Sequence, residues 1–140
     1  MTKISFYILK GDDSNNRQHF ACRLVEKAQR LGHHVYIHTD NAQQSEQLNQ
    51  ALWTFRPDSF VPHQLNTGQD NTCPVLIGHD AAPPRLMDFI INLSTNQPKF
   101  FSQFERMAEL LNDNDKIKQA GRDRYRFYQQ HGYEIETHQL

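Results

Sequence analysis

The sequence predicts an α/β domain built around a mostly parallel sheet. Short runs rich in β-branched and aromatic residues alternate with segments of helical periodicity. Strand, helix, strand and helix within about 55 residues favour a right-handed βαβ unit, which requires parallel strands. The chain has 140 residues, of which 37% are hydrophobic, including nine Phe and five Tyr. We therefore expect residues 1–140 to form one domain that buries a core without help from disulfides or metal.

The first βαβ unit can be followed residue by residue. The run at 4–9 is apolar and aromatic, which predicts a buried first strand. A helix is expected over 14–31, because Phe20, Leu24 and Ala28 recur on one stripe. Gly32 follows as a helix-ending residue, and residues 35–38 form the second strand.

The remaining elements follow from the same signals. Asp40 or Asn41 can cap a second helix that runs to about Phe55, and residues 56–72 form a loop. Two more strands are expected at 75–78 and 88–93, followed by a third helix at 101–111. A fourth helix is expected from Asn114 or Asp115 to Gly132, and residues 133–140 form a short edge strand or a loose tail.

Composition narrows the class of protein. The 15 basic and 16 acidic residues give a formal charge of −1, so no overall field attracts nucleic acid or membrane. Two cysteines are too few for a small disulfide scaffold. The apolar run near the start is too short for a signal peptide, and no segment reaches membrane-spanning length. We therefore expect a cytoplasmic protein with no membrane association.

Catalytic and cofactor motifs are scarce. The turn after the first strand, residues 10–16, has one glycine and two acids, where a phosphate-binding loop needs several glycines. Neither CxxC nor a helical HxxxH pair occurs, and Cys22 and Cys73 have no predicted base beside them. We expect no catalytic residues, no metal and no cofactor, with a small α/β nucleotide-binding enzyme as the alternative.

The last helix carries the clearest candidate surface. Residues 116–126 hold five basic residues and one acidic residue, and five minus one gives a charge of +4. On a helical wheel, four residues share the outward face: Lys118, Arg122, Tyr125 and Arg126. Such a face suits an acidic peptide with a free carboxylate, although a solvated helix face explains it equally well and single-stranded nucleic acid is a third reading. Arg124 falls on the apolar side, so it must extend to solvent or find an acidic partner.

A second candidate surface lies around the only tryptophan. Trp53 and Phe60 are aromatic residues in and beside a proline-bounded loop, where not every ring can be buried. Exposed aromatic residues of this kind mark interfaces, while ordinary packing against the sheet is the alternative.

Taken together, these segments resemble the chi subunits of bacterial DNA polymerase III over nearly the whole chain. The residues that carry the resemblance are Phe6-Tyr7-Ile8-Leu9, Gly32, Gln50-Ala51-Leu52-Trp53, Ser59-Phe60-Val61-Pro62-His63, Lys118-Gln119 and Arg122-Asp123-Arg124-Tyr125-Arg126-Phe127-Tyr128. The set is specific as a whole, although each segment alone is weak.

The resemblance implies a three-layer α/β/α sandwich without catalytic activity, acting as an accessory subunit of the replicative polymerase and monomeric when isolated. Its implied partners are the psi subunit, the clamp loader complex through psi, and the acidic tail of single-stranded DNA-binding protein, with DNA reached only indirectly. By position, the tail site is Lys118, Arg122, Tyr125, Arg126 and Leu111. The psi-binding surface is Trp53, Phe60, Val61 and Pro62. Gly121 and Asp113 depart from the pattern. Gly121 either loosens the helix or lets the backbone of the bound tail come close, and Asp113 places an acid near an acid-binding site.

Overall fold

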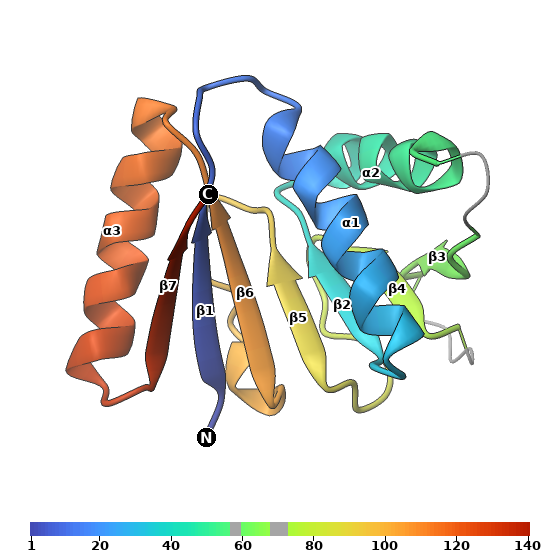
Figure 1. Cartoon of the computed structure of the whole chain (residues 1–140). Coiled ribbons are helices and arrows are strands. Elements are labelled where there is room, and N and C mark those ends of the chain that lie inside the picture. The colour runs from blue at the N-terminus through green and yellow to red at the C-terminus, as the bar shows by residue number, and fades with distance from the viewer. Residues whose placement is uncertain (57–59, 68–72) are drawn as a thin grey trace.

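The central feature of the computed structural model is one seven-stranded sheet. The structure describes residues 1–56, 60–67 and 73–140; Ser59 and the other positions of 57–59 and 68–72 lie outside the described residues. Every pairing between neighbouring strands is parallel, in the order β3-β4-β2-β5-β6-β1-β7 (Figure 1). The strands are β1 (Lys3–Ile8), β2 (Val35–His38), β3 (His63–Leu65), β4 (Val75–Gly78), β5 (Phe89–Asn92), β6 (Arg106–Leu111) and β7 (Ile135–Gln139).

Helices cover both faces of this sheet, which confirms the predicted α/β sandwich. The helices α1 (Asn16–Arg30) and α2 (Ala42–Thr54) pack on one face. The helix α3 (Asp115–Gln130) and the 3₁₀ turn η1 (Phe101–Gln103) pack on the other. The predicted helix ends are confirmed at three places: Asn41 caps α2, Asn114 caps α3, and Gly32 has a φ of 90° just after α1.

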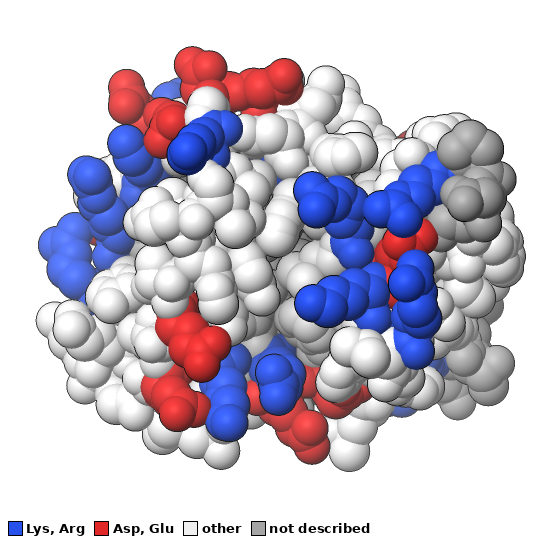
Figure 2. Space-filling view, in the orientation of Figure 1, with Lys and Arg blue, Asp and Glu red and all other residues white. Residues whose placement is uncertain are grey.

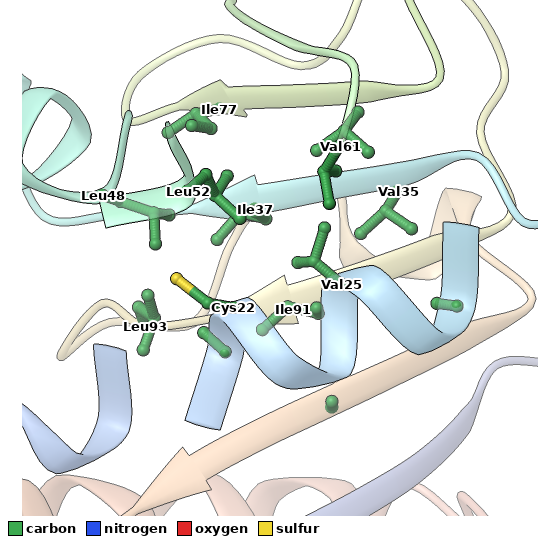
Figure 3. Close-up of a cluster of buried hydrophobic side chains, with 14 of the residues drawn as sticks. Cys22, Val25, Val35, Ile37, Leu48, Leu52, Val61, Ile77, Ile91 and Leu93 are labelled. Carbon is green, nitrogen blue, oxygen red and sulfur yellow. The ribbon is translucent and has the colours of Figure 1, made fainter. Parts of the chain in front are cut away.

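The core under α1 and α2 is aliphatic (Figure 3). Cys22 and Val25 of α1 point toward the sheet, and Leu48 and Leu52 of α2 pack beside them. Burial raises the pKa of the Cys22 thiol to about 12, so this cysteine remains an uncharged core residue at neutral pH.

The core on the opposite face is largely aromatic. Phe6 of β1, Phe101 of η1 and Tyr128 of α3 pack together there, with ring centroids 5.3 Å apart for Phe101 and Tyr128. Residues of one strand alternate between the two cores: Tyr36 faces the aromatic core, whereas Val35 and Ile37 face the aliphatic one. This second core fixes α3 on the sheet.

Two sequence-based predictions about elements were wrong. Residues 101–111 form η1 and then β6, where one helix was predicted. The run from Met107 to Leu111 is apolar apart from Glu109 and consists of good helix formers, but β6 lies between β5 and β1, where residues are buried on both faces. The predicted loop at 56–72 contains the short edge strand β3, and β7 confirms the edge strand predicted near the C-terminus.

In the described ranges, no helix combines the length and the apolar character needed to cross a membrane.

Candidate functional site

The position of α3 is fixed by a buried carboxylate on β6. Glu109 is fully buried, and its Oε2 accepts hydrogen bonds from Arg124 Nε at 3.0 Å and from the Tyr128 hydroxyl at 2.7 Å. Arg124 also donates to the Thr95 carbonyl at 2.9 Å, and Asn92 donates to the other Glu109 oxygen. Burial, followed by the Glu109 charge, raises the pKa of Tyr128, so its hydroxyl remains a donor. Of the two alternatives predicted for Arg124, an extension to solvent or an acidic partner, the structure has the acidic partner.

Gly121 allows α3 to approach the sheet closely. A Cβ at this position would lie 2.5 Å from Leu111 Cδ1 and 2.6 Å from Cδ2. The glycine is therefore needed for packing between α3 and β6, whereas the sequence indicated a weak point in the helix or a close approach of the bound tail. Leu111 is held beneath α3 with 6% of its surface exposed.

The outward face of α3 carries the four predicted residues together. Lys118 lies 3.8 Å from Asp113, and Arg126 lies 2.9 Å from Asp123, so both have ion-pair partners. Arg122 is exposed and makes no ion pair among the described residues. Asp113 also accepts a hydrogen bond from the Gly11 amide at 2.6 Å, so this acid is already engaged within the protein.

Beside Arg122 is a small apolar pocket with a volume of about 110 Å³. Tyr125 forms one wall and packs against Phe6, with ring centroids 5.3 Å apart. The pocket lies between α3 and the β1–β7 edge of the sheet, and its lining residues are Phe6, Ile8, Leu111, Gly121, Arg122, Tyr125 and Thr137. We call the pocket together with Lys118, Arg122, Tyr125 and Arg126 the tail site.

The tail site joins a guanidinium group to an apolar cavity sized for a single side chain. Arginine can bind a carboxylate through two parallel hydrogen bonds, and an apolar pocket gains free energy by removing a ring from water. Phe6, Ile8 and Thr137 were not predicted as site residues. Phe6 and Ile8 come from β1, far from α3 in sequence, whereas Thr137 comes from β7, which directly follows α3. Only the strand order brings them there.

The second predicted surface lies at the end of α2 and the start of β3. Trp53 is 50% exposed and Phe60 is 68% exposed, with ring centroids 5.6 Å apart. Buried His63 lies under Trp53 at 4.5 Å and is held by the carbonyls of Val61 and Asn49. We call Trp53, Phe60 and half-buried Pro62 the aromatic edge.

One residue predicted for this surface is not on it. Val61 is only 1% exposed and packs in the aliphatic core with Leu52 and Val25 (Figure 3). Its neighbours in sequence face outward because side chains alternate along extended backbone. The prediction that Val61 belongs to the binding surface is therefore corrected.

A polar cleft of about 1030 Å³ lies at the carboxyl ends of the strands, where open α/β sheets often bind ligands. It is the place to test the nucleotide-binding alternative. Asp12 and Glu46 line it together with several side-chain amides, and both acids would repel phosphate groups. Arg17 contributes a cation, but its guanidinium is buried and donates to the Leu93 carbonyl at 2.9 and 3.2 Å.

The fold and the two surfaces define a small, all-parallel α/β protein whose exposed features suit binding to other macromolecules. Residues 1–136 match the family of the DNA polymerase III chi subunit, HolC. The chain is 43% identical to DNA polymerase III subunit chi of Pseudomonas aeruginosa over 141 residues, covering 100% of this chain and 98% of that protein. It is 28% identical to DNA polymerase III subunit chi of Escherichia coli over 143 residues, covering 98% of this chain and 97% of that protein. The chain therefore belongs to the family of DNA polymerase III chi subunits, which are accessory subunits in DNA replication.

Proposed function

We propose that this chain is a non-catalytic adaptor of the replicative polymerase. In this proposal the tail site binds the acidic C-terminal tail of single-stranded DNA-binding protein, and the aromatic edge binds the psi subunit. Psi in turn joins the chain to the clamp loader complex, and the whole assembly works in the cytoplasm. The observation that carries the proposal is Arg122, an arginine without an ion-pair partner in the described part of the chain, beside an apolar pocket.

The chemistry of the tail site matches a peptide that ends in acidic residues, proline and phenylalanine. The terminal carboxylate pairs with Arg122, and the phenylalanine ring enters the pocket between Leu111 and Tyr125. Upstream acidic residues lie near Lys118 and Arg126, which exchange their intramolecular partners for the peptide. We expect micromolar affinity. Salt should weaken it, because the charges are exposed and salt screens them.

The aromatic edge suits a partner with an apolar surface. Two exposed rings in mutual contact form the kind of anchor that dominates binding energy at protein interfaces. The two surfaces lie toward opposite edges of the sheet, the aromatic edge near β3 and the tail site near β7 (Figure 1). One chain can therefore hold both partners at once, as a bridge requires.

Peptide titration tests the tail site. Replacing Arg122 by Ala removes a charge-assisted bidentate contact, which costs about 1.5–3 kcal/mol and weakens binding roughly 10- to 100-fold. Lys99→Ala removes an exposed cation elsewhere and should leave the affinity unchanged. Equal affinity of the Arg122 variant and the wild type would show that the site is wrongly assigned.

Titration of ATP, NAD and flavin against the chain tests the enzyme alternative. The proposal predicts no saturable binding of any of the three. Saturable binding that is lost on substitution of a residue in the polar cleft would replace the adaptor function with the nucleotide-binding one.

A further inference from the structure

Part of the sheet is left without a helix on the face that carries α1. The helix α1 lies in front of β2, and it contacts β2 and β6 (Figure 1). On the same face β1 and β7 have no helix in front of them (Figure 1). Glu136 and His138 of β7 are exposed there, so a ligand can reach these strands.

Aromatic rings cross this open face in a row. Phe20 of α1 lies 5.2 Å from Tyr7 of β1, and Tyr7 stacks on His138 of β7 at 4.8 Å with an interplanar angle of 15°. The Arg23 guanidinium lies 6.0 Å from the Phe20 ring centroid at the α1 end. We call Phe20, Tyr7 and His138 the ring row. Its members come from three elements, so only the fold brings them together.

A shallow hollow of about 180 Å³ opens beside the ring row. Tyr7 and Phe89 give it aromatic walls, and Ser5 adds a hydroxyl group. Its charged lining is balanced, with Lys3 and Arg106 against Glu134 and Glu136, so it favours a neutral base over a phosphate group. Glu136 lies 3.6 Å from His138 Nε2. A flat heterocycle with polar edges can use both kinds of lining: its faces contact rings, and its edges meet donors and acceptors.

A group of cations lies next to the ring row, along α1. Figure 2 shows basic side chains gathered over α1, on the face of the sheet that carries this helix. Arg30 and Arg56 both pair with Glu26, at 3.1 and 3.2 Å. With the exposed Arg23 and Lys27 of the same helix, the group has four cations and one acid, and four minus one gives +3. The cations from Arg23 to Arg30 extend over about 10 Å of helix.

We propose that the ring row and the α1 cations bind single-stranded nucleic acid directly. Its bases stack on Tyr7 and His138 and one base enters the hollow, while its phosphates follow α1. An acidic peptide would use the cations but not a row of stacked rings, and bases stack on such rings without regard to sequence. Membership in a DNA replication family makes single-stranded DNA the relevant polymer. The ring row lies on the α1 face of the sheet, whereas the tail site lies on the α3 face. The chain would then contact DNA directly, where only indirect contact through partners was expected.

Fluorescence anisotropy of a labelled oligodeoxythymidine with the full-length chain tests the proposal. A net charge of +3 predicts that the logarithm of the affinity falls with the logarithm of the salt concentration with a slope of about −2, the salt slope. A tenfold increase in salt should therefore weaken binding roughly 100-fold. His138→Ala should weaken binding about fivefold or more, through loss of one stacking partner. His131→Ala is the matched control, because His131 is exposed and stacks on Phe127 of α3. It should have no effect.

Charge variants separate this surface from the tail site. Replacing Arg23 and Lys27 by Ala should reduce the salt slope by about 1.4, because two phosphate contacts are lost. Lys99→Ala with Lys116→Ala removes the same charge elsewhere and should leave the slope unchanged. Thermal unfolding of each variant confirms that it is folded.

Three results would overturn the proposal. The first is that no oligonucleotide binds at low salt. The second is that His138→Ala and the double substitution of Arg23 and Lys27 by Ala both leave oligonucleotide binding unchanged. The third is that Arg122→Ala abolishes oligonucleotide binding. If polyglutamate binds the α1 cations and oligonucleotide does not, this surface binds an acidic protein partner instead. The first two results, and binding of polyglutamate alone, leave peptide binding at the tail site untouched, so failure of this proposal is distinguishable from failure of the adaptor function. The third result would place the oligonucleotide at the tail site instead.

Discussion

Replacing Gly121 by Ala tests how closely α3 approaches the sheet. In a helix interior, alanine is favoured over glycine by about 1 kcal/mol. Here the new methyl group would lie 2.5 and 2.6 Å from the two terminal carbons of Leu111, a separation that requires Leu111 or α3 to shift. Overpacking of this kind costs about 1–3 kcal/mol. We therefore expect Gly121→Ala to destabilise the protein by about 1 kcal/mol, where the helical preference alone predicts a gain.

A double-mutant cycle with Leu111→Ala isolates the contact. Leu111→Ala alone should cost about 2–5 kcal/mol, because it leaves a cavity. In that background the space is open, so Gly121→Ala should stabilise by about 1 kcal/mol, giving a coupling of about 2 kcal/mol. Urea unfolding of the four proteins measures each free energy. If Gly121→Ala stabilises the protein by the same amount with and without Leu111, the close approach of α3 and β6 is refuted.

Three further predictions concern other parts of the molecule. Glu109→Gln should destabilise the protein by about 3–5 kcal/mol in denaturant unfolding, because it leaves the buried Arg124 cation without its carboxylate; a change below about 1 kcal/mol would contradict the pairing. Burial lowers the pKa of His38 from 6.5 to about 4, so between these pH values the folded protein binds fewer protons than the unfolded chain. The free energy of unfolding should therefore fall by at most about 3 kcal/mol as the pH drops from about 6.5 to 4. Replacing His38 by Leu should remove this part of the pH dependence. Phe60→Ala should abolish co-purification with psi at unchanged melting temperature, whereas Leu86→Ala, at a side chain 87% exposed elsewhere, should leave it intact.

Local signals in the sequence were enough for much of the fold. Helix ends were predicted at Asn41, Asn114 and Gly32, because capping and positive φ depend on residues next to the helix. The first βαβ unit was predicted because apolar strand runs alternate there with a helical stripe, which is also a local pattern. β6 was not, since its apolar sequence fits a helix or a buried strand, and only its central place in the sheet decides between them.

The candidate sites depended more strongly on tertiary structure. The wheel placed Arg122 and Tyr125 on one face, but the pocket between them needs Phe6 and Thr137 from β1 and β7. The wheel also indicated that Arg124 must extend to solvent or find an acidic partner, without identifying Glu109. The ring row has no sequence signature, since Tyr7 and His138 are joined only by the parallel pairing of β1 with β7.

The central claim is that Arg122 binds the terminal carboxylate of an acidic peptide at the tail site. Calorimetric titration of a peptide ending in acidic residues, proline and phenylalanine, with a free or an amidated C-terminus, tests it against the wild type and Arg122→Ala. Amidation should weaken binding at least tenfold in the wild type and have little further effect once Arg122 is replaced. Equal affinity of the free and amidated peptides for the wild type would contradict it.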